Sequence, residues 1–222
     1  MLYLIPTPIG NLEDITFRAI RLLKEVDLIL VEDTRVSIKL LKHYDIVTPI
    51  ESFHMYNEHK KVHQIIENLK QGKNLAVISD AGTPGVSDPG FLLVRNALEV
   101  GVHVKCLPGP TALIPALVQS GIPCERFIFE GFLPPKKGRK GRLEEMSLES
   151  KTIVLYESPH KLLKLLYQMI PIFGSERKIV VVREISKLYE STFRGTIQEA
   201  KVFFEENIPK GEFVLVVEGI KK

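Results

Sequence analysis

The stretch SDAGTPGVSDPG at residues 79–90 decides how the rest of the sequence is interpreted. It follows an apolar run from Leu75 to Ser79 that is typical of a buried strand, and it precedes a pattern from Phe91 to Val100 that is typical of a helix. Connections of that length without secondary structure are uncommon in compact domains and often carry function. We therefore expect a strand, a ligand-binding loop and a helix here.

Three other loops are similarly rich in glycine and proline: Pro6 to Asn11, Pro108 to Ala112 and Gly131 to Pro135. Glycine permits positive φ and close approach of the backbone to a ligand, while proline restricts the loop before binding. Ordinary turn chemistry is the better explanation of any single loop of this kind. Four of them favour a preorganised small-molecule site.

Working outward, short apolar runs alternate with helical patterns in the first half, which indicates a parallel sheet covered on both faces. The expected strands there are Leu2–Ile5, Leu28–Val31, Leu75–Ser79 and Val102–Leu107, with helices over Thr16–Lys24, Ser37–Tyr44, Lys60–Lys70, Phe91–Val100 and Thr111–Ser120. Asp88 and Pro89 resemble an N-cap and first helical residue.

The second half alternates polar and apolar residues more often, which favours a mixed sheet. Its expected strands are Phe127–Glu130, Thr152–Tyr156, Ile179–Arg183 and Phe213–Val217, with an extended piece at Ser191–Gly195 and helices over Lys161–Ile170 and Ile197–Glu206. Gly121 and Pro123 form a helix stop. We predict a two-domain α/β protein, with domains at 1–122 and 123–222.

Composition narrows the class of protein. The 222 residues carry a net charge of +3, and no apolar run approaches the ~18 residues of a membrane span. The N-terminus has no basic segment ahead of its apolar run, so we expect a first strand and a cytoplasmic protein without membrane contact. Cys106 and Cys124 are expected to be free core thiols.

Charged residues cluster at two places. Glu32 to Arg35 end the second expected strand, at the sheet edge where open α/β sheets bind ligands, although Asp33 is equally well explained as a helix N-cap. Five cations lie in a glycine-interrupted segment that we expect to be a flexible loop, for contact with RNA phosphates or for solubility. They are Lys136, Lys137, Arg139, Lys140 and Arg142.

Some chemistries are disfavoured. Neither a Walker lysine pattern nor a G-x-G-x-x-G turn is present, which argues against a phosphate-cradling NTPase and a standard dinucleotide enzyme. His54, His59 and His63 have no third ligand at standard spacing, so we expect no metal.

These motifs, in this order, resemble those of the ribosomal RNA small-subunit methyltransferase I family, which has the tetrapyrrole-methylase fold. The matching pieces are Thr7–Leu12, Glu32–Arg35, Asp80–Gly90, Pro108–Ala112, Gly131–Pro134, Tyr156–His160, Arg183–Lys187 and Gly211–Val217. Departures such as Lys161, Thr111 and Ile185–Ser186 preserve charge, hydroxyl or size. Longer family members carry a further C-terminal segment, which we expect this chain to lack.

The resemblance implies S-adenosylmethionine as cofactor, bound between the two domains, and methylation of a cytidine ribose 2′-hydroxyl in the decoding centre of 16S rRNA, within the 30S subunit. It also implies a homodimer. The cofactor-binding residues that it implies are Pro8, Asp80, Thr83, Thr111, Ala112, Tyr156 and Glu157. It also implies that Arg183 faces the part of the cofactor site that the first domain supplies.

Catalysis has two candidate sets. Arg183, Glu184 and Lys187 follow one expected strand, and Glu32, Asp33 and Arg35 follow another. Either set supplies a base or a cation for the attacking hydroxyl, and Arg183–Glu184 is equally well explained as an ion pair. Two other functions stay open: C-methylation of a tetrapyrrole, and RNA binding without catalysis.

Overall fold

The structure, a computed structural model, describes residues 1–220 and divides into two compact units. The first runs from Met1 to Thr111, and the second begins at Ala112. The division therefore falls after Thr111, whereas the sequence places the domain boundary after Ile122.

The first unit is a parallel α/β sheet with strand order β3-β2-β4-β1-β5. Its elements are β1 (Leu2–Leu4), the 3₁₀ helix η1 (Leu12–Asp14), α1 (Phe17–Glu25), β2 (Leu28–Val31), α2 (Thr34–His43), β3 (Ile50–Ser52), α3 (Glu58–Lys70), β4 (Leu75–Ile78), α4 (Phe91–Glu99) and β5 (Val104–Cys106). The sequence patterns missed the three-residue strand β3, which is half-buried throughout.

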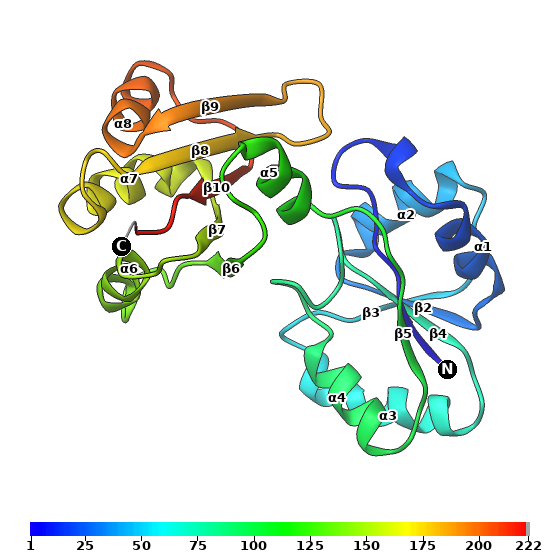
Figure 1. The fold of residues 1–222 in the computed structure, drawn as a ribbon. Helices are drawn as coiled ribbons and strands as arrows, with labels where there is room; N and C mark the ends of the chain where they lie inside the picture. Colours follow the sequence, from blue (N-terminus) through cyan, green and yellow to red (C-terminus); the bar gives the residue numbers. More distant parts are fainter. Residues whose placement is uncertain (221–222) are drawn as a thin grey trace. The chain divides into compact units, whose positions relative to one another are not determined.

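Helices cover both faces of this sheet, with α1 and α2 on one side and α3 and α4 on the other (Figure 1). Each face has its own core, because alternate strand residues point to opposite sides. Ile29 packs with α1 and α2, while Leu30 packs with α3 and α4. This arrangement confirms the predicted parallel sheet.

The second unit contains a mixed sheet of order β6-β7-β10-β8-β9, in which only the β6–β7 pair is parallel. Its elements are α5 (Leu113–Ser120), β6 (Phe127–Phe132), α6 (Arg139–Ser147), β7 (Thr152–Glu157), α7 (Pro159–Phe173), β8 (Lys178–Arg183), β9 (Ser191–Thr196), α8 (Ile197–Glu206) and β10 (Phe213–Val217). The predicted mixed sheet is confirmed.

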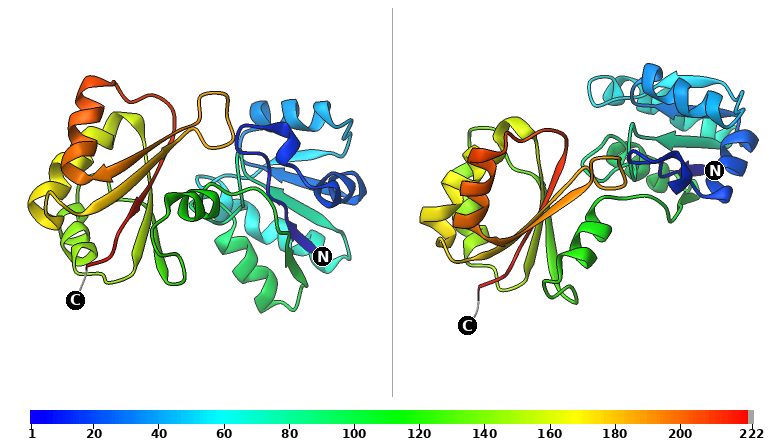
Figure 2. Two further views of the ribbon diagram at one scale, coloured as in Figure 1. Left: turned by 45° about the horizontal axis from the view of Figure 1, so that its top comes forward. Right: turned by 90° about the horizontal axis from the view of Figure 1, so that it is seen from above.

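Packing explains why the second unit begins at Ala112. Helices α6, α7 and α8 bury one face of its sheet around Leu155, Val181 and Leu215. Helix α5 packs on β7, β8 and β10 from the opposite face, as the right-hand view of Figure 2 shows. Since α5 covers the other face of the second sheet, it belongs to that unit although it precedes Gly121.

Several helix ends follow local chemistry. Thr16 caps α1, Thr196 forms a capping box with Glu199 before α8, and Gly121 ends α5 in the left-handed region. The N-cap and first-turn roles predicted for Asp88 and Pro89 are wrong, because α4 begins at Phe91 behind Gly90. Gly90 has φ of 131°, a conformation that strongly favours glycine, so the turn continues two residues further.

Two further expectations need correction. Cys106 and Cys124 are free thiols, but both are exposed and do not belong to the core. The basic segment is not a loop throughout, because α6 begins at Arg139. Arg139 is 4% exposed, so its charge lies inside the protein.

Arg139 makes a buried ion pair. Its Nη2 donates to Glu157 Oε2 at 3.1 Å, its Nε donates to Gln168 Oε1 at 2.9 Å, and its Nη1 donates to the Pro134 carbonyl at 3.4 Å. Glu157 Oε1 accepts from the Ser158 amide at 2.9 Å. These contacts join α6, α7 and the end of β7, and they offset the cost of removing two charges from water.

We predict that Arg139→Ala lowers the free energy of unfolding by about 3–5 kcal/mol, because it leaves the Glu157 carboxylate buried without its counter-ion. Urea unfolding measures this loss. Lys140→Ala, on the same helix with a side chain 84% exposed, is the matched control and should change stability by less than about 0.5 kcal/mol. Equal stability of the two variants would contradict the structural role of Arg139.

Candidate functional site

The candidate site begins with three loops that leave adjacent strands at one edge of the first sheet. Strands β4, β1 and β5 are neighbours, and all three are parallel, so the loops that follow them emerge side by side. Thr7 and Gly82 exchange two backbone hydrogen bonds of 2.9 Å, which join the first loop to the second. Thr83 Oγ1 donates to the Pro110 carbonyl at 3.2 Å, which joins the second loop to the third.

Close packing adds to these hydrogen bonds. A Cβ placed on Gly109 would lie 2.8 Å from Pro6 Cβ, so only glycine fits without a shift of the proline. The buried Thr7 hydroxyl donates to the Ser79 carbonyl at 3.0 Å. The edge is therefore a fixed backbone surface, and it includes the predicted cofactor residues Pro8, Asp80 and Thr83.

The next strand contributes charge to the same edge. Strand β2 is the neighbour of β4, and the Asp33 amide donates to Asp80 Oδ1 at 3.0 Å. Asp33 also caps α2 by accepting from the Arg35 amide, and it pairs with the Arg35 guanidinium at 2.6 Å. Hydrogen bonds from that side chain and amide lower the pKa of Asp33 to about 2.

The N-cap and the ligand-edge interpretations of Asp33 are thus both compatible with its position. The side chain of Arg35 is 88% exposed. Its guanidinium is therefore accessible from solvent while it pairs with Asp33.

A group of carboxyls on this edge has raised pKa values. Burial raises the pKa of Glu32 and of Asp80, and their mutual charge repulsion adds to the shift of Glu32. Burial, together with the charge of Glu32, raises the pKa of Asp88 to about 7, although a hydrogen bond with Ser79 opposes the shift. Displaced carboxyl pKa values are frequent at functional sites.

The sequence analysis missed Asp88 as a site residue, because Asp88-Pro89 matches a helix start. A second signal was available in the sequence. Asp88 belongs to the same glycine-rich loop as Asp80, and the turn at Gly90 separates both from the helix.

Thr111 and Ala112 follow the third loop, and Ala112 is the N-cap position of α5 without a side-chain hydrogen bond. Both are half-buried. They lie where the chain passes from the first unit to the second.

In the second unit, the predicted cofactor residues Tyr156 and Glu157 differ in environment. Tyr156 is half-buried between two phenylalanines, with ring centroids 5.0 Å from Phe129 and 5.5 Å from Phe132. Glu157 is 4% exposed, and Arg139 and the Ser158 amide occupy its carboxylate. The Glu157 side chain therefore supports the end of β7.

The predicted catalytic residues Arg183, Glu184 and Lys187 lie at the end of β8 and in the turn that follows it. Arg183 Nε donates to the Lys210 carbonyl at 2.6 Å. Glu184 Oε1 accepts from Lys187 Nζ at 3.0 Å and from the Glu212 amide at 2.8 Å. The Lys187 ammonium also contacts Glu212 Oε2 at 2.9 Å.

This turn is backbone-strained and electrostatically fixed. Glu184 and Ser186 both have positive φ, at 53° and 67°, which is unusual for residues other than glycine. Burial raises the pKa of Glu184, but hydrogen bonds from Lys187 and the Glu212 amide more than offset it, so the pKa lies below its ordinary value. The carboxylate is therefore ionised at neutral pH and is a weak base.

The five predicted RNA-binding cations separate into two groups. Arg139 is buried, and Arg142 makes ion pairs with Glu130 at 2.5 Å and Glu145 at 2.6 Å. Lys136 and Lys137 are exposed, and within residues 1–220 no acidic group pairs with either. Lys140 is exposed with Glu144 at 3.7 Å.

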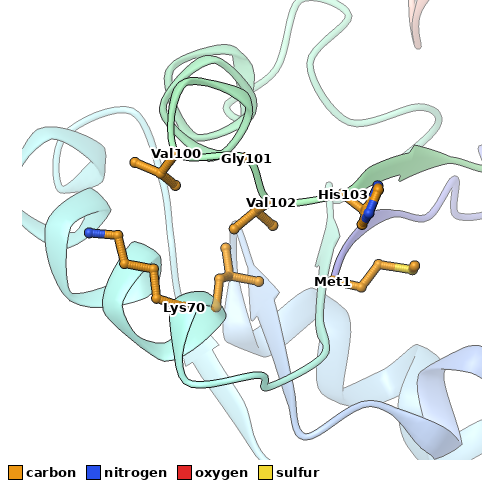
Figure 3. Close-up of a pocket in the computed structure, with 7 residues that line it drawn as sticks. Met1, Lys70, Val100, Gly101, Val102 and His103 are labelled. Atoms are coloured by element: carbon orange, nitrogen blue, oxygen red, sulfur yellow. The ribbon is translucent and has the colours of Figure 1, made fainter.

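An open pocket lies elsewhere on the first unit. It has a volume of about 340 Å³ and is lined by the end of α3 and by residues that precede strands β1 and β5, including Met1, Val102 and His103 (Figure 3). This is the amino edge of the first sheet, and parallel α/β sheets bind ligands at the carboxyl edge. We therefore assign the candidate site by its loops.

Among residues 1–220, no helix is both long and apolar enough to cross a membrane.

Comparison with known proteins now identifies the class. Residues 1–201 match the family model described as Tetrapyrrole (Corrin/Porphyrin) Methylases. The chain therefore belongs to the tetrapyrrole methylase family.

Curated relatives refine this result. The chain is 49% identical over 220 residues to the "Ribosomal RNA small subunit methyltransferase I" of Synechocystis, covering 99% of this chain and 79% of that protein. It is 50% identical to the protein of that name from Bacillus subtilis, with coverages of 99% and 75%, and 46% identical to that of Thermotoga maritima, with coverages of 98% and 98%. The resemblance inferred from the motifs is confirmed.

Solved structures confirm the fold. A diphthine synthase superposes with a TM-score of 0.77 at 13% identity, covering 98% of this chain and 89% of its own. A cobalt precorrin-4 methyltransferase superposes with a TM-score of 0.68 at 19% identity, with coverages of 98% and 94%.

We predict that Asp88→Asn removes a pH-dependent part of the stability. The folded-state pKa of about 7 lies above the ordinary value of 3.8, so the folded protein binds the proton more tightly than the unfolded chain. This group's contribution is fully present below pH 3.8 and is lost as pH rises through about 7.

The measurement is urea unfolding of both proteins across this pH range. The stability of the variant relative to wild type should rise from the acidic to the neutral end. Asp45→Asn, at an exposed carboxyl, is the control. A constant difference between wild type and Asp88→Asn would contradict the raised pKa.

Proposed function

We propose that this protein is an S-adenosylmethionine-dependent methyltransferase of ribosomal RNA. The observation that carries the proposal is the 49–50% sequence identity, over 99% of this chain, to proteins named ribosomal RNA small subunit methyltransferase I. The loops that contain the matching motifs are joined by hydrogen bonds at one edge of the first sheet. The more specific part of the proposal is the acceptor, a cytidine ribose 2′-hydroxyl in the decoding centre of 16S rRNA.

The residues of the first unit's edge fit this cofactor. S-adenosylmethionine carries a positive sulfonium and an α-ammonium group, and the edge presents the carboxyls of Glu32, Asp80 and Asp88. Residues 79–90 include no lysine or arginine to oppose them. Pro8, Thr83 and Thr111 are proposed to supply the fixed backbone for the uncharged parts, and Ala112 and Tyr156 are the proposed cofactor residues of the second unit.

The cofactor supplies a methyl group on a sulfonium leaving group, so the reaction is a displacement in line with the S–CH₃ bond. The main task of the protein is to hold the acceptor oxygen on that line, a kind of positioning that can contribute ~7–11 kcal/mol. Loops fixed to one another before binding suit that task because little further ordering is needed.

The transfer leaves the neutral thioether S-adenosylhomocysteine, and the acceptor hydroxyl releases its proton to water. Arg183 and Lys187 are proposed to stabilise the developing negative charge, with Glu184 holding the Lys187 ammonium in position. Arg35 is the alternative cation, held by Asp33. The low pKa of Glu184 favours positioning over proton abstraction for this carboxylate.

The proposed substrate is 16S rRNA within the 30S subunit, in the cytoplasm, and the proposed active form is a homodimer. One small basic segment cannot locate a single nucleotide by charge, so shape must contribute to recognition.

We predict that the purified protein transfers one methyl group from S-adenosylmethionine to 30S subunits isolated from cells that lack the modification. Mass spectrometry of nuclease-digested RNA locates the methyl group on the ribose of one cytidine. Asp80→Ala should weaken cofactor binding by about tenfold or more, because a charge-assisted hydrogen bond contributes about 1.5–3 kcal/mol. Calorimetry with S-adenosylmethionine and S-adenosylhomocysteine measures the cofactor affinity of the wild-type protein and of the variant.

Three outcomes would contradict parts of this proposal. Absence of cofactor binding would reject the methyltransferase. Methylation of a base would reject the 2′-hydroxyl. Transfer to a tetrapyrrole, with none to RNA, would replace the substrate class and leave the fold unaffected.

We also predict that the lysines of the basic segment, and not its arginines, contact phosphates. Lys136→Ala/Lys137→Ala should lower the slope of log affinity for 30S against log salt by about two, because fewer counter-ions are released. Lys24→Ala/Lys105→Ala, at exposed positions, gives the same change of net charge and should leave the slope unchanged. Equal slopes in the two double variants would assign Lys136 and Lys137 to solubility.

A further inference from the structure

Phe132 presents an aromatic ring at the surface beside the predicted cofactor residue Tyr156. Its residue is 59% exposed, although it belongs to β6 and is directly paired with Tyr156 of β7. The two ring centroids are 5.5 Å apart at an interplanar angle of 61°. Tyr156 in turn contacts Phe129 edge-on, so the position of the Phe132 ring is supported from one side.

The backbone around Phe132 is fixed. Gly131 is buried with φ of 64°, at a register shift of the β6–β7 pair, and Leu133 is 4% exposed. Arg139 donates to the carbonyl of Pro134. Buried neighbours on both sides therefore hold Phe132 outward.

Cations follow within a few residues. Lys136 and Lys137 are exposed, and no acidic group in residues 1–220 pairs with them. The nearby arginines Arg139 and Arg142 are held by Glu157 and Glu130, so their acidic partners are already neutralised. The surface thus combines one supported aromatic ring with two free ammonium groups.

We propose that Phe132 is a stacking platform for an unpaired base of the RNA substrate, with Lys136 and Lys137 contacting the adjoining phosphates. The proposal rests on the RNA methyltransferase function and specifies how that substrate is held. Proteins bind single-stranded RNA by stacking bases on aromatic side chains while a positive surface follows the backbone. An apolar protein partner would gain nothing from the two charges.

The experiment measures affinity for a short unstructured RNA oligonucleotide and for an abasic oligonucleotide of the same length. Phe132→Ala should weaken binding of the base-bearing RNA about tenfold, as expected for loss of one base–aromatic stack. It should leave binding of the abasic strand unchanged. Phe132→Tyr keeps the ring and should restore affinity.

Phe17→Ala is the matched control, since Phe17 is a 94% exposed phenylalanine on α1. It should change neither affinity. Circular dichroism and urea unfolding check that Phe132→Ala is folded, and Phe132→Leu, which also removes the ring but keeps more apolar volume, replaces it if it is not.

Each result has one meaning. Equal effects of Phe132→Ala on both strands, or none on either, would overturn the inference. A loss of S-adenosylmethionine affinity with RNA affinity intact would assign the ring to the adenine of the cofactor and also overturn it. If the wild-type protein methylates 30S subunits and Phe132→Ala binds RNA normally, the inference about Phe132 is rejected and the proposed function stands. If RNA binding depends on the Phe132 ring but the wild-type protein transfers no methyl group, the proposed function is rejected and the inference about Phe132 stands.

Discussion

Parallel pairing is the constraint on which the candidate site depends. A parallel strand must be followed by a crossover, so the loops after β1, β2, β4 and β5 all emerge at one edge of the first sheet. Residues far apart in the sequence are brought together by this rule alone. The hydrogen bonds of Thr7 with Gly82, of Thr83 with Pro110 and of Asp33 with Asp80 then fix the loops to one another.

The fold could be predicted from sequence because its signals are local. Continuous apolar strands and the stop at Gly121 each depend on a few neighbouring residues. Errors arose where tertiary context decides the outcome. Asp88-Pro89 has the local pattern of a helix start, but Gly90 turns the chain again before α4. The boundary depends on α5 packing across the second sheet, which no local pattern records.

The site was less predictable, because charge in a sequence does not show where the charge lies. Five cations in residues 136–142 suggested one exposed cluster, yet Arg139 points into the core and Arg142 is held by two glutamates. The Glu184 and Lys187 side chains likewise bind each other and the chain near Glu212. Composition gives the number of charges, while burial and pairing decide how many can meet a ligand.

The Thr7–Gly82 bridge also bears on how the protein folds. Its partners are 75 residues apart, and Thr83 lies 27 residues from Pro110, so the loop edge consists of contacts with large loop-closure entropy. Such contacts cannot form until β1 and β4 lie side by side. The surface proposed to hold the cofactor is therefore complete only when the first sheet is complete.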